Sequence, residues 1–212
     1  MKVVAFNGSP HEKGNTYAAI RMVGEELERE DVELEVVQVG KHAIRGCLAC
    51  NVCFKKRDGC CVIQDDPVNG WIRKLEEADG VILGSPVYYA ALSGTMKCFL
   101  DRAFYVATAN GGLFRHKVGA SVVAVRRCGG IPAMDQLNHY IGYAEMLMPT
   151  SNYWNVIYGN SPNEVVEDEE GKQIMRILGK NMAWLMKLVE YGKGKVEEPE
   201  KERKRAMSFI RP

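Results

Sequence analysis

The sequence lacks any excess of one charge and any long apolar run. It contains 28 basic and 27 acidic residues among 212, so its charge does not indicate binding to nucleic acid. No apolar stretch is long enough to cross a bilayer, and no signal peptide precedes the first predicted strand. We therefore expect a cytoplasmic protein with no nucleic-acid partner and no membrane partner.

The first glycine-containing loop lacks the fingerprints of several common phosphate-binding loops. It covers residues 6–16, with the sequence FNGSPHEKGNT. A nucleotide-hydrolysing loop needs a lysine after its second glycine, but Asn15 stands there. The dinucleotide pattern Gly-x-Gly-x-x-Gly is missing, and no cysteine that could act as a phosphatase nucleophile precedes Cys47. What remains is a loop that would hold a phosphate without cleaving it.

The same loop has the features of an anion cradle. The apolar residues 3–6 predict a buried strand, and a helix is expected to start near Asn15. Loop amides and a helix N-terminus carry partial positive charge. Ser9, Asn15 and Thr16 can add hydrogen bonds to a phosphate. The terminal phosphate of FMN fits this description, although an ordinary capped turn between strand and helix would give the same local sequence.

The rest of the chain alternates between predicted strands and helices. Strands are expected at 3–6, 32–39, 80–84, 118–125 and 153–158, and helices at 17–29, from about 67, and at 94–105, 133–146 and 171–190. Such alternation predicts an α/β fold with a five-stranded parallel sheet and helices on both faces. The loops at Ser9, Pro86 and Arg126 follow strands, so they should converge on one crevice.

The chain length suits a single α/β domain, without an internal repeat or a second domain. We assign this domain to residues 1–192, with an inserted cysteine loop at 41–66. Residues 193–212 form a charged C-terminal extension that is rich in Glu, Lys and Arg. We expect this extension to be solvated. The alternative is an arm that docks Phe209 and Ile210 on a neighbouring subunit.

Cysteine is concentrated in one place, because five of the seven cysteines fall between residues 47 and 61. In a cytoplasmic chain such thiols are more often reduced or metal-bound than paired in disulfides. The spacing Cys47-x-x-Cys50-x-x-Cys53 followed by Cys60-Cys61 suits one compact [4Fe-4S] cluster. Structural zinc more often uses two pairs that are further apart. Unmetallated thiols are the equal alternative, and spacing alone permits either Cys60 or Cys61 as the fourth ligand.

Several stretches resemble one family. The loop Gly-Ser-Pro-His-x-x-Gly-Asn-Thr at 8–16 is similar to the first loop of flavodoxin-like, NAD(P)H-dependent FMN reductases and of the related iron–sulfur flavoproteins. The stretches GSPVYY at 84–89, VRRCGG at 125–130 and YWN at 153–155 are also similar to that family. The resemblance spans nearly the whole chain. It departs at His11, where the family usually has arginine.

The resemblance implies a flavodoxin-like three-layer sandwich that binds FMN through three loops. The expected FMN contacts are Ser9, His11, Asn15, Thr16, Pro86, Val87, Tyr88, Tyr89, Arg126 and Gly129. The first four would address the phosphate, and the loop at 86–89 would lie along the flavin ring. Matching Cys-Val-Ile-x-Asp-Asp to the family selects Cys61 as the fourth cluster ligand, with Cys60 as the alternative.

The implied function is an oxidoreductase in which FMN takes electrons from NAD(P)H and passes them to a quinone, a flavin or another acceptor. No acid, base or nucleophile in the sequence requires a catalytic role, so none is assigned. The alternative is an electron carrier that links FMN, a [4Fe-4S] cluster and a ferredoxin-type partner. A homodimer or homotetramer is expected. We expect Lys97, Asp101 and Arg102 to form a surface ion-pair set.

Overall fold

The computed structural model describes residues 1–202 and residue 205. Phe209 and Ile210, on which the docking-arm alternative depends, lie outside the described residues. The elements are β1 (Lys2–Asn7), α1 (Asn15–Glu28), β2 (Glu33–Gln38), α2 (Val52–Lys56), α3 (Val68–Glu77), β3 (Gly80–Tyr88), β4 (Ala91–Leu92), α4 (Gly94–Ala109), β5 (Val118–Val125), α5 (Gly130–Tyr143), β6 (Val156–Tyr158), the 3₁₀ turn η1 (Glu164–Glu167) and α6 (Glu169–Gly192).

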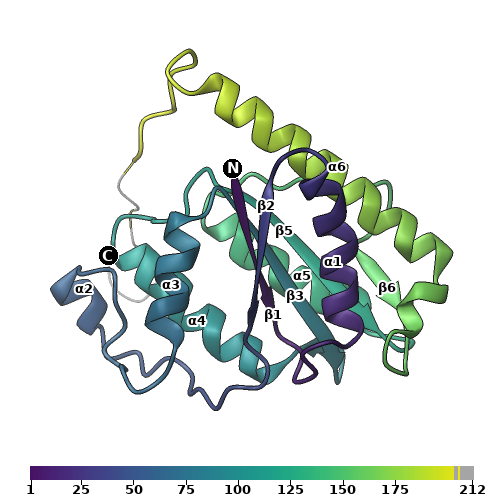
Figure 1. The fold of residues 1–212 in the computed structure, drawn as a ribbon. Helices are drawn as coiled ribbons and strands as arrows, with labels where there is room; N and C mark the ends of the chain where they lie inside the picture. Colours follow the sequence, from purple (N-terminus) through teal and green to yellow (C-terminus); the bar gives the residue numbers. More distant parts are fainter. Residues whose placement is uncertain (203–204, 206–212) are drawn as a thin grey trace.

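Five of the strands form the predicted parallel sheet, and their order is β2-β1-β3-β5-β6 (Figure 1). A sixth strand, β4, pairs with β3 in the antiparallel direction and contributes only two residues. The order changes direction between β1 and β3. The loops that leave the carboxyl ends of these two strands therefore run to opposite faces of the sheet and leave a crevice between them.

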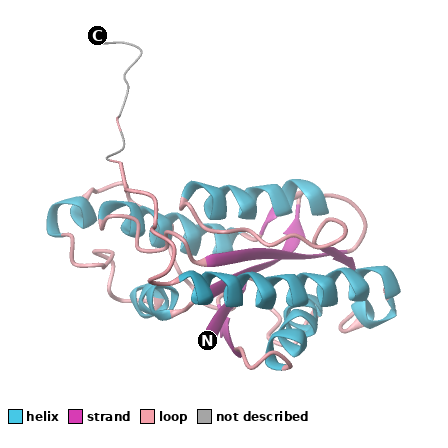
Figure 2. Cartoon of the chain, turned by 90° about the horizontal axis from the view of Figure 1, so that it is seen from above, coloured by secondary structure: helices cyan, strands magenta, loops and turns pink. Residues whose placement is uncertain are grey.

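The helices cover both faces of the sheet and complete three layers (Figure 2). One face packs on α1 and α6, and the other packs on α3, α4 and α5. The alternation of side chains along β1 shows why both faces need cover. Val3 and Ala5 point into the first core, while Val4 and Phe6 point into the second. None of the helices in the described part of the chain combines the length and hydrophobicity needed to span a bilayer.

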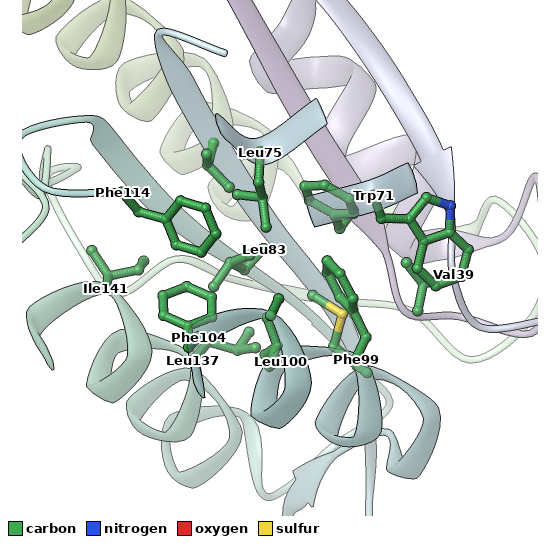
Figure 3. Packing of buried hydrophobic residues seen from close by; sticks show 14 of the residues in the cluster. Val39, Trp71, Leu75, Leu83, Phe99, Leu100, Phe104, Phe114, Leu137 and Ile141 are labelled. Carbon is green, nitrogen blue, oxygen red and sulfur yellow. The ribbon is translucent and has the colours of Figure 1, made fainter. Parts of the chain in front are cut away.

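The core beneath α3, α4 and α5 is rich in aromatic side chains (Figure 3). The ring of Phe99 lies 4.7 Å from that of Phe6 and 5.4 Å from that of Trp71, measured between centroids. The rings of Phe104 and Phe114 meet edge to face at 5.2 Å. Contacts of this kind add about 0.5–1.5 kcal/mol per pair to the burial of apolar area. This core fixes α4 against the sheet.

The structure differs from the predicted elements near residue 85. β3 continues to Tyr88, where the sequence indicated a loop, because residues 87 and 88 pair with β4. The two-residue turn between these strands consists of Tyr89 and Ala90, with φ of 50° and 59°. A tight hairpin of this kind prefers Asn-Gly, since other residues cost about 1–2 kcal/mol each in this conformation. Neither Tyr89 nor Ala90 is a residue typical of such a turn, which explains why the hairpin was missed.

Candidate functional site

A cavity of about 460 Å³ opens at the carboxyl ends of the strands, where the predicted crevice should lie. It is formed by the loops that follow β1, β3, β5 and β6. Its walls are Ser9, His11, Lys13, Gly14, Asn15, Thr16, Pro86, Val87, Tyr88, Ala124, Arg126, Gly159, Asn160 and Pro162. The structure thus brings together eight of the ten residues named as FMN contacts, and the other two, Tyr89 and Gly129, lie outside the walls.

The charges around this cavity suit an anion. Three lining residues, His11, Lys13 and Arg126, carry basic or imidazole side chains, and none of the lining residues is acidic. Helix α1 begins at Asn15, and no side chain caps its first turn. The free N–H groups and the dipole of this helix therefore face the cavity and favour a phosphate.

The shape of the first loop is fixed by two amide side chains that the sequence analysis did not single out. Asn7 is fully buried; its Oδ1 accepts the N–H of Ser9 at 3.1 Å, and its Nδ2 donates to Gln38 Oε1 at 2.7 Å. Gln38 Nε2 in turn donates to the carbonyl of Ser9 at 2.6 Å. Asn7 and Gln38 are register partners at the ends of β1 and β2. The sequence does contain a signal for this support: each of two neighbouring strands ends in a residue with an amide side chain.

One of the two polar side-chain atoms of Asn15, which lines the cavity, has no hydrogen-bond partner. Its Nδ2 donates to the carbonyl of Ser161 at 2.9 Å, whereas its buried Oδ1 has no hydrogen-bond partner. An unpartnered acceptor at this position fits a hydroxyl donor such as the ribityl chain of a flavin. A Cβ on Gly159 would lie 3.0 Å from Asn15 Nδ2, so glycine leaves the room that this contact needs.

The fourth wall, residues 159–162, was missed by sequence reasoning, which used only three of the loops at this edge. Glu164 holds this wall in place, because its Oε2 accepts the N–H groups of Asn160 at 2.7 Å and Ser161 at 2.6 Å. These backbone donors, Ser161 first, lower the pKa of Glu164 below its ordinary value. The wall follows β6, so the strand-end rule that located the other loops could have found it.

The second and third loops are supported by close backbone packing. Pro86 and Val87 are half-buried at the cavity, Tyr88 is exposed beside it, and Tyr89 is fully exposed at the tip of the hairpin. Gly129 has φ of 90°, and a Cβ there would lie 2.7 Å from the Cα of Ala90. Glycine at 129 therefore lets the third loop approach the hairpin. Contact of Tyr89 or Gly129 with a flavin stays a prediction.

A serine joins the first two loops. The N–H of Gly8 donates to the carbonyl of Gly84 at 2.8 Å, and Ser93 Oγ donates to the carbonyl of Gly8 at 2.7 Å. The N–H of Ser93 donates to Ser85 Oγ at 2.9 Å, while its hydroxyl caps α4. The first loop and the end of β3 are thereby held as one unit around the cavity.

The cysteine loop forms a second, much smaller cavity of about 20 Å³. Its walls include Cys47, Cys50, Cys53 and Cys61, the four predicted ligands, whereas Cys60 lies outside it. An all-thiol donor set suits an iron–sulfur cluster. Within residues 1–202 and 205, however, no group of three or more His, Cys, Asp or Glu is arranged so that it could hold a metal ion. The residue types therefore fit a cluster, and cluster binding is kept as a proposal.

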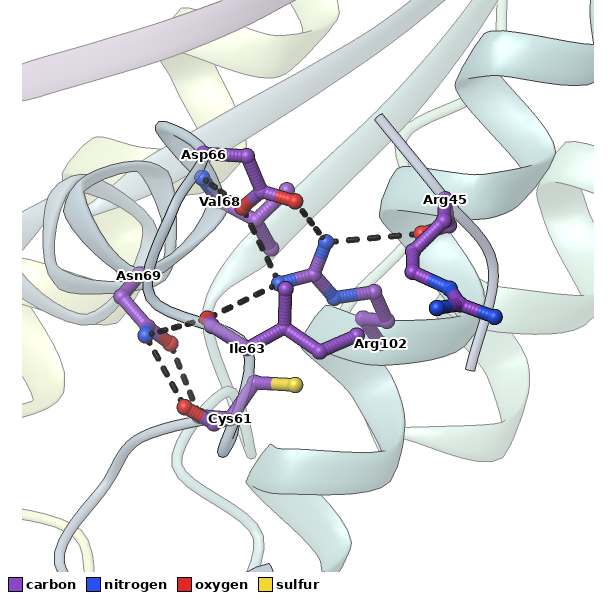
Figure 4. A network of polar contacts seen from close by, with 7 residues as sticks. All are labelled: Arg45, Cys61, Ile63, Asp66, Val68, Asn69 and Arg102. Atoms are coloured by element: carbon purple, nitrogen blue, oxygen red, sulfur yellow. Dashed lines mark hydrogen bonds and ion pairs between the residues drawn. The ribbon is translucent and has the colours of Figure 1, made fainter. Parts of the chain in front are cut away.

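Arg102 closes this loop, and the expectation that it lies on the surface is wrong (Figure 4). Its guanidinium pairs with Asp66, with one bond from Nη2 to Oδ1 of 3.0 Å, and donates to the carbonyls of Ile63 at 3.2 Å and Arg45 at 3.4 Å. Its Nε is buried without a partner. Burial opposes the charged form, but hydrogen bonds to Asp66 and Cys61 outweigh it and raise the pKa of Arg102.

The other two members of the expected surface set behave as predicted. Lys97 Nζ lies 2.6 Å from both carboxylate oxygens of Asp101, one helical turn away. Both side chains are more than a third exposed. Tyr140 donates its hydroxyl to Asp101, and burial together with this carboxylate raises the pKa of Tyr140 to about 12. Asp101 therefore pairs with Lys97 within α4 and links α4 to Tyr140 of α5.

The fold and the cavity together define a class of protein. A parallel sheet with this strand order, and with a crevice where the order reverses, is the architecture of flavodoxin-like proteins. The chain belongs to the NADPH-dependent FMN reductase family, which residues 1–161 match. It is therefore an oxidoreductase of the NAD(P)H-dependent FMN reductase type. The matched region ends within the fourth wall of the cavity.

Two relatives of this chain are named iron–sulfur flavoproteins. An iron–sulfur flavoprotein of Methanocaldococcus jannaschii is 33% identical over 197 residues, which cover 90% of this chain and 100% of the relative. An iron–sulfur flavoprotein of Archaeoglobus fulgidus is 32% identical over 175 residues, or 81% of this chain and 83% of the relative.

A solved structure of RosB with a bound 8-demethyl-8-formylriboflavin-5′-phosphate intermediate superposes with a TM-score of 0.72 at 17% identity. The superposition covers 100% of this chain and 93% of RosB. At this identity the likeness shows the shared fold alone.

Proposed function

We propose that this protein binds FMN in the large cavity and transfers electrons from NAD(P)H to a quinone, a flavin or another acceptor. The observation that carries the proposal is the cavity itself, which is free of acidic walls and meets the N-terminus of α1. Its basic side chains and the unpartnered Oδ1 of Asn15 match a ligand that has both a phosphate and hydroxyl groups.

The residues of the cavity would then have separate roles. Ser9, Thr16 and Arg126 would hold the phosphate, and Asn15 Oδ1 would accept a hydroxyl of the ribityl chain. Pro86, Val87 and Tyr88 would lie against the ring and shield it from water, since they form the apolar side of the cavity. When bound, FMN supplies the capacity to accept and release a hydride. The protein contributes binding and orientation.

The second candidate function is an electron carrier that resembles the iron–sulfur flavoproteins. Two observations favour it: the four cysteines share one cavity, and relatives at 32–33% identity carry that name. Cys47, Cys50, Cys53 and Cys61 would hold a [4Fe-4S] cluster that exchanges single electrons with a ferredoxin-type partner. In either case we propose a homodimer or homotetramer, in which the exposed Tyr153 and Trp154 would gain cover.

One experiment tests both candidates. The protein is purified without oxygen, its absorption spectrum is recorded, and iron, zinc and acid-labile sulfide are measured. Oxidation of NADH and NADPH is then followed with a quinone or free FMN as the electron acceptor, and reduction of the protein by reduced ferredoxin is followed in a separate assay. Yellow, iron-free protein that oxidises NAD(P)H supports the reductase. Brown protein that reacts with ferredoxin and not with NAD(P)H supports the carrier. Failure to bind FMN at all overturns both.

A further inference from the structure

We propose that Arg102 is a positioning residue that closes the cysteine loop and raises the reduction potential of the redox centre held there. This inference rests on the iron–sulfur alternative of the proposed function. It concerns a residue that provides no ligand to that centre. Three observations carry it: the contacts of the guanidinium, its unused donor, and the distribution of charge around it.

The first observation is the position of the contacts along the chain. Arg102 donates to the carbonyl of Arg45, which precedes the first cysteine, and to the carbonyl of Ile63, which follows the last one. It therefore ties together the two ends of the segment 45–63, which carries all four proposed ligands. The loop has only the short helix α2 as regular structure of its own. A rigid anchor from α4 replaces the missing backbone pairing.

The second observation is the donor that has no partner. Arg102 is 1% exposed, and its Nε is buried without a hydrogen bond although the residue lines the cysteine cavity. A buried N–H that lacks an acceptor is costly, so native proteins rarely leave one unused. The sulfur atoms of ligating thiolates and of an iron–sulfur cluster accept hydrogen bonds from N–H groups. Such hydrogen bonds tune the reduction potential of the cluster. Cys61 and Arg102 line the same cavity.

The third observation is the local charge. Asp66 is the carboxylate paired with Arg102, and the side chains of the two are 7% and 0% exposed. Two substitutions in this ion pair can therefore change the local charge in opposite directions. Loss of the arginine charge removes a cation beside the cavity, and loss of the aspartate charge removes the anion that offsets it.

The other charges near the loop are more exposed, and water and salt screen them. Lys97 is paired with Asp101, while Lys55 and Lys56 of α2 lie on the surface. The charge of the buried pair should therefore act on the cavity more strongly than that of any of these groups.

The sign of each effect follows from the charge of the centre. Reduction adds a negative charge to the centre, so a nearby cation favours the reduced form. Replacing Arg102 with neutral glutamine should therefore lower the potential. Replacing Asp66 with asparagine keeps a hydrogen-bond acceptor of similar shape but frees the arginine charge, so it should raise the potential. A role in loop structure alone would not move the potential in opposite directions.

The test measures the midpoint potential of the anaerobically reconstituted holoprotein by redox titration, with the absorption of the iron–sulfur centre as the readout. The variants are Arg102→Gln, Asp66→Asn and Arg102→Lys. We expect about a tenfold fall in the reduction equilibrium for R102Q, which is about 59 mV for a one-electron centre. D66N should shift the potential upward, and R102K, which keeps the charge, should lie closer to the wild type.

The outcomes separate this inference from the function on which it rests. If the wild-type protein takes up no iron and sulfide, the iron–sulfur alternative is wrong and the inference falls with it. If wild type, R102Q and D66N all load iron and share one potential, only the role of Arg102 is overturned. If R102Q does not fold, D66N and R102K still decide, because an unchanged or lowered potential in D66N contradicts the proposal.

Discussion

The flavin cavity and the cysteine loop of this protein are positioned in different ways. The cavity lies where a parallel sheet reverses its strand order, and its walls are the ends of four strands. The cysteine loop lies outside the sheet and is held on α4 by a few side chains: the buried ion pair of Arg102, and Tyr105, whose hydroxyl donates to Asn51 Oδ1 at 2.6 Å. The comparison teaches that strand order distributes the support of one site over many backbone contacts, whereas the other depends on a few side chains, of which Arg102 is the most buried.

The contrast predicts where single substitutions act. A side chain at the flavin cavity shares its task with loop amides, a helix terminus and neighbouring side chains, so its loss should reduce affinity by a limited factor. The loss of Arg102 removes several contacts at once and leaves a buried carboxylate without its partner. The predictions below follow this order, from the largest effect to the smallest.

Arg102→Ala should destabilise the protein by about 3–5 kcal/mol, because it leaves Asp66 buried and unpaired. The free energy of unfolding is measured by urea titration. Lys187→Ala is the matched control, since Lys187 pairs with Glu30 where both side chains are nearly half exposed, and such pairs contribute about 0–1 kcal/mol. Similar losses in the two variants would mean that the cysteine loop does not depend on its buried pair.

Gly40→Ala tests the backbone support of the flavin cavity. A Cβ on Gly40 would lie 2.2 Å from the carbonyl carbon of Ser9, so the first loop must move. We expect a loss of about 1–3 kcal/mol in stability, typical of overpacking, together with weaker FMN binding. Gly70→Ala in α3 is the control, because a Cβ there meets no atom within 4 Å and alanine favours helix by up to about 1 kcal/mol. Unchanged FMN affinity in G40A would contradict the prediction.

Arg126→Gln should weaken FMN binding by about tenfold, which corresponds to the loss of one charge-assisted hydrogen bond of about 1.4 kcal/mol. Riboflavin, which lacks the phosphate, should bind equally well to the variant and the wild type. Both affinities are measured by quenching of flavin fluorescence. Arg176→Gln on the exposed side of α6 is the control. An equal loss of affinity for FMN and riboflavin would mean that Arg126 contacts the flavin ring or supports the packing of the cavity, and does not bind the phosphate.

Glu164→Gln should have the smallest effect, and the difference from the wild type should disappear at acid pH. The pKa of Glu164 is lowered from 4.5 in the folded state by the N–H groups of Ser161 and Asn160. Its contribution to stability is therefore present above pH 4.5 and is lost as the pH falls through the lower folded pKa. The melting temperature of E164Q should depend less on pH in this range than that of the wild type, with Glu170→Gln as control. If the melting temperatures of E164Q and the wild type change with pH in the same way, this prediction is wrong.

Much of the flavin cavity could be predicted from the sequence because it follows from strand order. The apolar runs located the five parallel strands, and three polar loops at their ends then had to meet. The supports of that cavity were harder to find. Asn7 and Gln38 contact each other across paired strands, and Glu164 reaches back to the turn after β6, so each needed long-range pairing or a turn that the sequence does not mark.

The fate of Arg102 shows the same limit more clearly. Helical spacing places Lys97, Asp101 and Arg102 close together, and a surface ion-pair set was the natural expectation. Asp101 and Lys97 do form such a pair, but Arg102 points to the other side of α4 and is buried under the cysteine loop. Neighbouring positions on a helix differ by about 100° in direction, so one residue can face the core while the next faces solvent. The path of an irregular loop cannot be read from spacing.

The hydroxyl of Ser93 that reaches the carbonyl of Gly8 spans 85 positions of sequence. Two of the segments proposed to bind FMN are therefore joined only after the first strand and the fourth helix have come together. Closing so long a loop is entropically expensive, so the flavin site should assemble late in folding and cooperatively with the whole domain. Release of FMN during unfolding would then coincide with loss of helical circular dichroism, and flavin fluorescence would report how much of a preparation is fully folded.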